Sequence, residues 1–403
     1  MSDADKPTLR PANDNPWYCL ATLHGEQPMA DDELASKNRI AWNRWIATAL
    51  SDEERASLVR NGFLEAELAP FSPEEKIAFC RAYAARTGRK KELPPEPTES
   101  PDFTFTQFDH AVTFAGFLFA READFNSATF SANFTSATFS GGANFFEATI
   151  FLANFTSATF SGSTSFTSAT FHGPANFTSA MFCGDASFFE AAFSGDTYFH
   201  SATFCGRVDF RSATFSDHTS FDSAAFSKVA HFGSATFSES AHLFSATFGD
   251  EAFFTSATFS NAAFVSATFA SGTDFMWAKF HDVSFNQATF SGATNFSFAT
   301  FSGFVDFKSA TFSGYAIFAW TKFTGEDPTI PESATFTSAT FSDRANFRSV
   351  TFSKPVDFAS ATFAGATNFY STEFSGGANF ASTRVLRRCE VPRREIRFND
   401  DVR

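Results

Sequence analysis

The chain has 403 residues, a net charge of −14, and 62 Phe residues against five Trp and five Tyr. This length would ordinarily suggest two or three domains, but so large an excess of one residue type indicates a repeat fold, which grows by stacking further units. The acidic balance argues against direct nucleic-acid binding, because such binding needs a basic surface that neutralises phosphates.

The charge is unevenly distributed along the chain. The net charge is −4 over residues 1–100, −13 over 101–383 and +3 over 384–403. The N-terminal sequence has no apolar signal segment, and no run of about 18 apolar residues occurs, so we expect a cytoplasmic protein without a membrane span. Five scattered cysteines do not make a disulfide framework.

Residues 16–88 are predicted to form a small α-helical domain. Its first long helix runs from about residue 31 to residue 50, with Trp42, Trp45 and Ile46 on one apolar stripe. The two tryptophans are most simply core residues. A peptide-binding groove beside them is the alternative.

Two capping boxes predict the starts of two further helices. Ser51 with Glu54, and Ser72 with Glu75, each pair an N-cap hydroxyl with an acid three residues on. Gly62 is suited to end the first of these helices. The second has a predicted apolar face of four residues: Ile77, Cys80, Tyr83 and Ala84.

Three segments fall outside the compact parts. Residues 1–15 are polar and rich in Pro, Asn and Asp, so we expect disorder. Residues 89–101 form a Pro-rich linker. The basic tail, residues 384–403, could cap the repeats, form a homodimer or contact an acidic surface.

A Phe ladder fills residues 102–383. From Phe155 it continues at Phe160, Phe166, Phe171 and Phe177, so that the spacing alternates between five and six residues. Ala usually precedes the ladder residue by two positions, and in a strand residues i and i−2 point the same way, here inward. A period of five fits neither a long strand nor a helix, but it fits a short strand followed by a corner.

The Ala-x-Phe repeat resembles the pentapeptide-repeat family in its Phe-centred form. The resemblance implies a mainly β fold, a right-handed, four-sided β-helix (β-solenoid), here preceded by the small α-helical domain. Four units per coil, alternating five and six residues, predict coils of 22 residues. Phe160 should then stack on Phe182, and Phe193 on Phe215.

The sequence contains no catalytic triad, phosphate-binding Gly loop, paired-carboxylate cleft or metal-ligand set, so we expect no enzyme activity and no cofactor. The favoured function is a non-catalytic protein-interaction scaffold with an unknown protein partner. Two alternatives stay open. One is a DNA mimic that modulates a type II topoisomerase, as some proteins of the resembled family do. The other is an ice- or surface-binding ladder of Thr and Ser.

Candidate partner-binding residues are acids in two places. Four of them directly precede a ladder Phe: Asp209, Asp274, Asp306 and Asp357. The remaining three belong to an insertion between Phe323 and Phe336 that we expect to leave the solenoid as a loop: Glu326, Asp327 and Glu332. The competing interpretation is a solvated Asn/Asp ladder for the first group and a tolerated insertion for the second. Cys183 and Cys205 lie one predicted coil apart, about 5 Å.

Overall fold

A computed structural model describes residues 8–26, 32–89, 91–325, 334–387 and 389–390. The chain divides into two compact units, residues 1–187 and 188–403. The first contains five α-helices and the first coils of a β-solenoid, and the second continues the coils. Among the described residues, no helix is both long and apolar enough to cross a bilayer.

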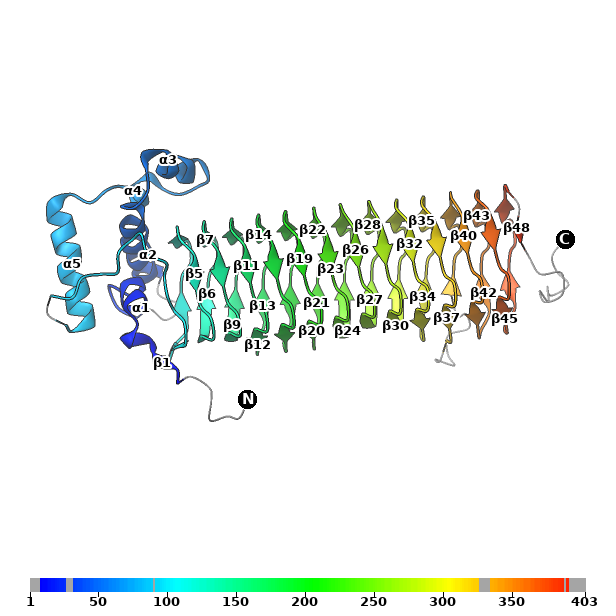
Figure 1. Ribbon diagram of the computed structural model, residues 1–403, viewed down its shortest axis with the longest axis horizontal. Helices are drawn as coiled ribbons and strands as arrows, with labels where there is room; N and C mark the ends of the chain where they lie inside the picture. The colour runs from blue at the N-terminus through cyan, green and yellow to red at the C-terminus, as the bar shows by residue number, and fades with distance from the viewer. Residues whose placement is uncertain (1–7, 27–31, 90, 326–333, 388, 391–403) are drawn as a thin grey trace. The chain divides into compact units, whose positions relative to one another are not determined.

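Helices of the first unit begin and end largely where their caps predict (Figure 1). The helices are α1 (Pro16–Ala21), α2 (Asp32–Ala47), α3 (Asp52–Arg60), α4 (Glu65–Leu68) and α5 (Pro73–Thr87). Both predicted capping boxes are confirmed at Ser51 and Ser72. Helix α3 ends at Asn61, and Gly62 follows it with a φ of 106°. The confirmed caps show that helix boundaries here are encoded locally.

The predicted apolar face of α5 is wrong in part. Phe79 and Tyr83 are buried, whereas Ile77 is 53% exposed. Tyr83 packs toward α1 and donates to the Pro16 carbonyl at 3.2 Å, while Phe79 stacks on Trp45 with ring centroids 4.9 Å apart. Aromatic partners in other helices therefore decide which side of α5 is buried. These partners cannot be read from the sequence pattern of α5 alone.

Each coil of the solenoid has four faces, which we number 1 to 4 in chain order. In the first unit, face 1 holds β4 (Leu118–Phe119), β7 (Thr138–Phe139), β10 (Thr159–Phe160) and β14 (Met181–Phe182). Face 2 holds β5 (Ala123–Asp124), β8 (Ala143–Asn144), β11 (Thr164–Ser165) and β15 (Ala186–Ser187). Faces 3 and 4 hold β2 (Thr106–Gln107), β3 (Val112–Thr113), β6 (Thr129–Asn133), β9 (Thr149–Asn154), β12 (Thr170–Phe171) and β13 (Ala175–Asn176).

The second unit repeats the same four faces. Face 1 holds β18 (Thr203–Phe204), β22 (Ala225–Phe226), β25 (Thr247–Phe248), β28 (Thr268–Phe269), β31 (Thr289–Phe290), β35 (Thr311–Phe312), β39 (Thr340–Phe341), β43 (Thr362–Phe363) and β47 (Arg384–Val385). Face 2 holds β19 (Val208–Asp209), β23 (Ala230–His231), β26 (Ala252–Phe253), β29 (Thr273–Asp274), β32 (Thr294–Asn295), β36 (Ala316–Ile317), β40 (Ala345–Asn346), β44 (Thr367–Asn368) and β48 (Cys389–Glu390).

Face 3 of the second unit holds β16 (Ala192–Phe193), β20 (Thr214–Phe215), β33 (Thr300–Phe301), β37 (Lys322–Phe323), β41 (Thr351–Phe352) and β45 (Glu373–Phe374). Face 4 holds β17 (Thr197–Tyr198), β21 (Thr219–Ser220), β34 (Val305–Asp306), β38 (Ala334–Thr335), β42 (Val356–Asp357) and β46 (Ala378–Asn379). Three strands run around the corner from face 3 to face 4: β24 (Thr236–His242), β27 (Thr258–Ala263) and β30 (Lys279–Ser284). The four-sided β-solenoid is thus confirmed within each unit.

The ladder Phe residues fill the inside of the coils. Phe160 stacks on Phe182 and Phe193 on Phe215, with centroids 4.8 Å apart in both pairs, as predicted within each unit. The inward Ala two residues before a ladder Phe is also confirmed, for example at Ala158, which is fully buried. Each buried Phe contributes about 2–3 kcal/mol to stability before the entropy cost of ordering is subtracted.

The predicted uniform coil of 22 residues is only partly right. Strand register pairs Thr138 with Thr159, 21 residues on, and Thr159 with Met181, 22 residues on. The difference arises at one corner, between faces 3 and 4, where ladder residues are four apart at Phe130 and Phe134 but usually six. The corner between faces 1 and 2 keeps six residues, and the other two corners keep five.

The two five-residue corners are turns with one residue in the left-handed region. At Ser157 φ is 56°, and the Ala158 N–H donates to the Phe155 carbonyl at 3.0 Å. This is the geometry of a type II turn, which requires a positive φ at its third residue. Ser occupies this position in most coils.

The helices of the first unit pack against its first coil. Two fully buried asparagines make the junction. Asn43 accepts from the Leu118 N–H at 2.8 Å and donates to the Gly116 carbonyl at 3.0 Å, as a neighbouring strand would. Asn15 donates to the Asp102 carbonyl at 2.9 Å. The helical segment therefore covers the open edge of the first coil.

The predicted disorder of residues 1–15 is wrong for the part that the structure describes. Strand β1 (Arg10–Pro11) pairs in parallel with β2 and so extends face 3 by one strand. Asn15 caps α1 by accepting from the Trp17 N–H at 2.9 Å. Composition alone predicted disorder because the segment is polar, yet its backbone hydrogen bonds are satisfied by the first coil.

Candidate functional site

The four predicted aspartates lie on two opposite faces of the second unit. Asp209 in β19 and Asp274 in β29 belong to face 2, whereas Asp306 in β34 and Asp357 in β42 belong to face 4. The structure therefore does not bring the four carboxylates together. The loop acids Glu326, Asp327 and Glu332 lie outside the described residues. Phe312 and Phe341 are register partners, so the longer spacing between Phe323 and Phe336 leaves the pairing of neighbouring strands intact.

Each of these aspartates has a local structural role. An Asp274 oxygen accepts from the Met276 N–H at 2.9 Å, and an Asp306 oxygen from the Lys308 N–H at 2.7 Å. Asn occupies the same position elsewhere and does the same, as at Asn295 toward the Ser297 N–H. Such side-chain-to-backbone bonds two residues on are typical of Asx turns. The position needs an acceptor oxygen and does not need a charge.

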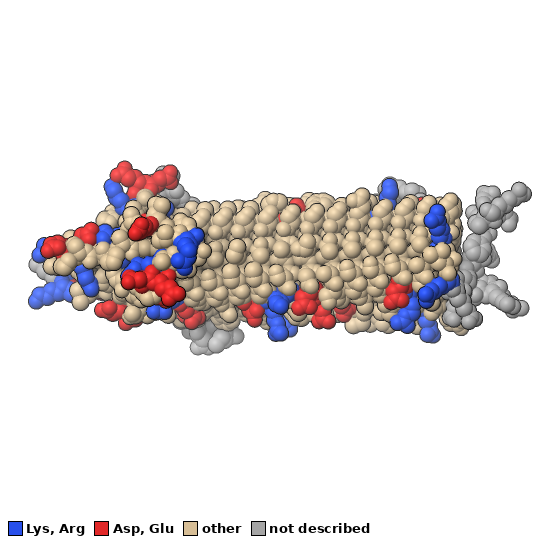
Figure 2. All heavy atoms as spheres, turned by 90° about the horizontal axis from the view of Figure 1, so that it is seen from above, with Lys and Arg blue, Asp and Glu red and all other residues tan. Residues whose placement is uncertain are grey.

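Neighbouring side chains also offset these charges. Arg211 forms an ion pair with Asp209 at 2.6 Å, and Asn379 donates to Asp357 at 2.9 Å. In the view of Figure 2, much of the surface over the coils is uncharged, and acidic side chains are interspersed with basic ones. No continuous acidic track is seen on that face.

Cys183 and Cys205 are both exposed. They belong to different units, so their close approach stays a prediction. Among the described residues, no group of three or more His, Cys, Asp or Glu could hold a metal ion.

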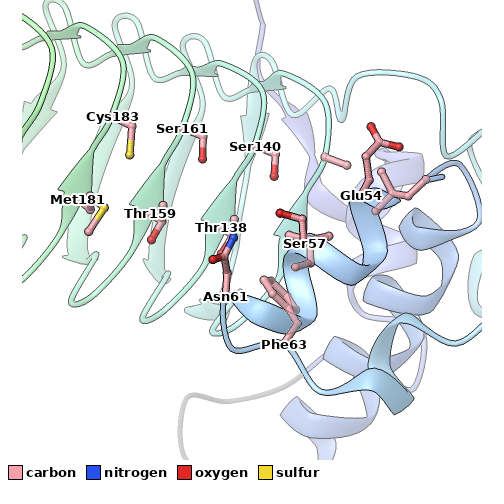
Figure 3. Close-up of a pocket in the computed structure, with 13 residues that line it drawn as sticks. Glu54, Ser57, Asn61, Phe63, Thr138, Ser140, Thr159, Ser161, Met181 and Cys183 are labelled. Carbon is pink, nitrogen blue, oxygen red and sulfur yellow. The ribbon is translucent and has the colours of Figure 1, made fainter. Parts of the chain in front are cut away.

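A groove in the first unit was missed by the sequence analysis. It lies between α3 and face 1, and its volume is about 560 Å³. Figure 3 shows Ser57 and Asn61 of α3 and its C-terminal turn opposite Thr138, Thr159 and Met181 of β7, β10 and β14. No residue of α3 is buried, so this helix stands along the coils with both sides accessible.

Two rows of small polar side chains form the floor of this groove. Thr138 and Thr159 are register partners, and Met181 continues their row. Ser140 and Ser161 line the second row, each directly after a ladder Phe. These positions repeat because the coils repeat, so the floor offers evenly spaced hydroxyl groups about 4.8 Å apart.

The wall of the groove includes both apolar and polar side chains. Leu50, Leu58 and Phe63 line it together with the polar Ser57 and Asn61. Apolar walls with a few placed polar groups are typical of binding sites. No direct signal for this groove is present in the sequence, because its width depends on how α3 is held by residues distant in the chain.

Glu54 is the one carboxylate among the residues that line the groove. It accepts from both the Ser51 N–H and the Ser51 hydroxyl at 2.7 Å, and the backbone bond lowers the pKa of its carboxyl. Its role is therefore to cap α3. The described lining residues include no His, Lys or Arg that could serve as a base or stabilise an anion.

A second depression of about 410 Å³ lies on the other side of the Asn61–Phe63 turn. It reaches the ion pair of Arg39 and Glu67, whose closest atoms are 2.9 Å apart. Glu67 is buried and also accepts from Asn43 at 3.2 Å. This pair links α2 with α4 beneath the turn, so it fixes the position of the groove wall.

Comparison with known proteins finds a family model that matches part of the chain and a solved structure that is similar to it. Residues 336–384 match the family model of pentapeptide repeats, in nine copies. The solved structure of HetL, a pentapeptide repeat protein involved in heterocyst differentiation regulation from the cyanobacterium Nostoc, is similar at 12% identity, with a TM-score of 0.25. That match covers 69% of this chain and 85% of HetL. No curated protein matches the chain.

Proposed function

We propose that this chain, whose residues 336–384 match the family model of pentapeptide repeats, is a non-catalytic scaffold that binds a partner protein. The observation that carries the proposal is the groove between α3 and face 1, with an apolar wall and a floor of repeated hydroxyl groups. Coils filled by stacked Phe rings place all recognition on the outside of the solenoid. A regular floor beside an exposed helix suits an extended or helical peptide segment of a partner.

Site-specific photocrosslinking in the native host tests this proposal. A photoreactive amino acid at Ser57 or Ser140 should form an adduct with one discrete protein, because both positions line the groove. The same probe at Glu147, an exposed corner residue of face 2, is the matched control. Filling the groove by Ser161→Trp should remove the adduct. Equal adducts at Glu147, or an adduct that survives Ser161→Trp, would contradict the proposal.

The DNA-mimic alternative has less support. Its four described aspartates lie on opposite faces and accept backbone hydrogen bonds. A supercoiling assay with DNA gyrase from the same cell is its direct test, and salt-sensitive inhibition would favour it.

A specific observation keeps the surface-binding alternative open. Thr residues are register partners through five successive coils on face 1 of the second unit: Thr268, Thr289, Thr311, Thr340 and Thr362. An ice-recrystallisation assay tests it.

A further inference from the structure

Three exposed aromatic side chains form a row in the second unit. Trp277, Phe298 and Trp320 are 52%, 38% and 51% exposed. All three occupy the left-handed position of the corner between faces 2 and 3, in successive coils. The coils before and after have Ser256 and Ser349 at this position.

The corner itself does not need these aromatic residues. Their φ angles are 62°, 60° and 63°. A positive φ costs an L-residue with a side chain about 1–2 kcal/mol, and it is least common for bulky residues. Exposure of large apolar rings to water adds a further cost. Ser meets the requirement of the turn in the neighbouring coils, so the aromatic side chains are explained by something outside the turn.

The three rings stack on one another. The centroids of Trp277 and Phe298 lie 4.4 Å apart with 9° between the planes, and those of Phe298 and Trp320 lie 6.4 Å apart with 4° between the planes. Stacked rings present their edges to an approaching molecule, and the edge of an aromatic ring is the positive end of its quadrupole. Sugars stack on ring faces, so this arrangement does not favour a carbohydrate.

Basic side chains accompany the aromatic row. Lys279 and Lys322 are exposed on face 3, each two residues after a Trp, and both are register partners of Thr300. Arg348 is exposed one coil further on, and its carbonyl accepts from the Trp320 N–H at 3.0 Å. From the corner to the end of the face 3 strand, the four coils that contain these residues include no Asp or Glu: residues 276–280, 297–301, 319–323 and 348–352.

We propose that this aromatic–basic strip, comprising Trp277, Phe298, Trp320, Lys279, Lys322 and Arg348, binds an acidic segment of a partner protein that also carries apolar side chains. The Lys and Arg side chains of the strip attract an acidic segment, whereas the chain as a whole, with a net charge of −14, does not. Apolar side chains of the segment cover the rings. Trp and Arg are also the residues in which binding energy at protein interfaces is concentrated. The proposal names the partner chemistry and so rests on the proposed scaffold function, but it concerns a surface separate from the groove.

Intrinsic fluorescence can report on this strip alone. The chain has five Trp, of which Trp17, Trp42 and Trp45 are buried. Collisional quenchers will therefore act on Trp277 and Trp320. Iodide should quench more strongly than caesium at equal ionic strength, because an exposed Lys lies two residues after each of the two Trp residues. Lys279→Glu with Lys322→Glu should reverse the order. Equal quenching by the two ions, unchanged in the double variant, would overturn the charge argument.

Binding is then measured with a synthetic acidic peptide, DEFDELDEF, against its basic counterpart KKFKKLKKF. The acidic peptide should protect the two indoles from acrylamide and shift their emission to the blue, and the basic peptide should not. The double variant W277S/W320S places the residue of the neighbouring coils at both corners, so it should fold, and it should bind the peptide about 10-fold or more weakly. Because the variant lacks both reporter indoles, its binding is measured by titration calorimetry beside that of the wild type. Equal affinity of wild type and variant for the acidic peptide, or equal binding of both peptides by the wild type, would overturn the proposal.

Two further measurements separate this inference from the scaffold function. The groove variant Ser161→Trp should bind the acidic peptide as the wild type does, because it lies in the other unit. If groove crosslinking succeeds while the peptide does not bind, the strip is refuted and the scaffold function stands. If the wild type self-associates in sedimentation and W277S/W320S does not, the occupant is a second copy of the chain and the proposed partner is wrong.

Discussion

Two single substitutions, Gly292→Ala and Gly272→Ala, should differ in their effect on stability. At one of these glycines there is room for a Cβ, and at the other there is not. Gly272 and Gly292 lie in the corner between faces 1 and 2 of successive coils. A Cβ on Gly292 would lie 2.3 Å from the carbonyl carbon of Ser271, whereas a Cβ on Gly272 meets nothing closer than Glu251 Cγ at 3.9 Å. Gly292→Ala therefore forces backbone against backbone, and Gly272→Ala makes ordinary contact.

The coils have little freedom to relieve this clash. Hydrogen bonds on either side fix their spacing, from the Thr273 N–H to the Ala293 carbonyl and from the Thr294 N–H to the Tyr315 carbonyl, both at 2.9 Å. Overpacking of this kind costs about 1–3 kcal/mol. For a unit of this size that corresponds to a fall in Tm of roughly 2–12 °C.

Scanning calorimetry of the two single variants measures the difference, and amide exchange at Thr273 and Thr294 locates it. We expect Gly292→Ala to lower Tm and to speed exchange at both amides, with Gly272→Ala within about 1 °C of the wild type. Equal destabilisation by both substitutions would refute the reasoning, because it would mean that contact with the neighbouring coil does not decide the cost. A pure effect on the entropy of the unfolded chain would raise stability in both variants.

Substitutions at three other positions test parts of the structure described above. Asp357→Asn should leave stability almost unchanged while Asp357→Ala costs about 1–2 kcal/mol in urea unfolding, because only the Asn keeps an acceptor for the Ala359 N–H; equal losses would mean that the charge matters. Asn43→Leu should cost about 2–4 kcal/mol and expose the Leu118 amide to exchange, since that N–H loses its partner; retained protection would argue against the capping of the first coil. Burial, followed by the nearby charge of His218, lowers the pKa of His242, so the folded chain binds a proton there less readily than the unfolded chain. Stability should then fall as pH drops below about 6.5, and His242→Gln should flatten that part of a Tm–pH profile; a profile unchanged by the substitution would contradict this.

Features that depend on a single coil could be predicted from the sequence. The inward Phe and Ala follow from the two-residue alternation of a strand, and the capping boxes at Ser51 and Ser72 follow from contacts within four residues. The stacking of Phe160 on Phe182 needed only the sum of the four ladder spacings in one coil, which alternate between six and five. Because the units repeat regularly, these local rules were enough to predict the inward residues across the ladder and the stacking in coils of 22 residues.

Features that depend on contacts between distant segments could not be predicted. The exposed position of Ile77 was missed because the partners of Phe79 and Tyr83 lie in other helices. The groove was missed for the same reason, because the position of α3 depends on residues outside that helix. The aspartates before ladder Phe residues were selected for their charge, whereas the structure shows that their oxygen caps the turn. An alignment of Asn295 with Asp274 already contained that signal, because the amide and the acid exchange freely at one position.

The variable corner between faces 3 and 4 has a consequence for protein engineering. Ladder residues across it are four apart at Phe130 and Phe134, five at Phe259 and Phe264, and 13 at Phe323 and Phe336, yet the strands before and after the corner stay paired with those of the neighbouring coil. Chain length can thus change at this corner without moving any strand. A foreign epitope grafted between Phe301 and Phe307, where the spacing is six, should be displayed at a fixed height beside the native insertion. Grafts at this corner in successive coils would place different peptides at intervals of about 4.8 Å, so that ligands could be displayed at defined spacings.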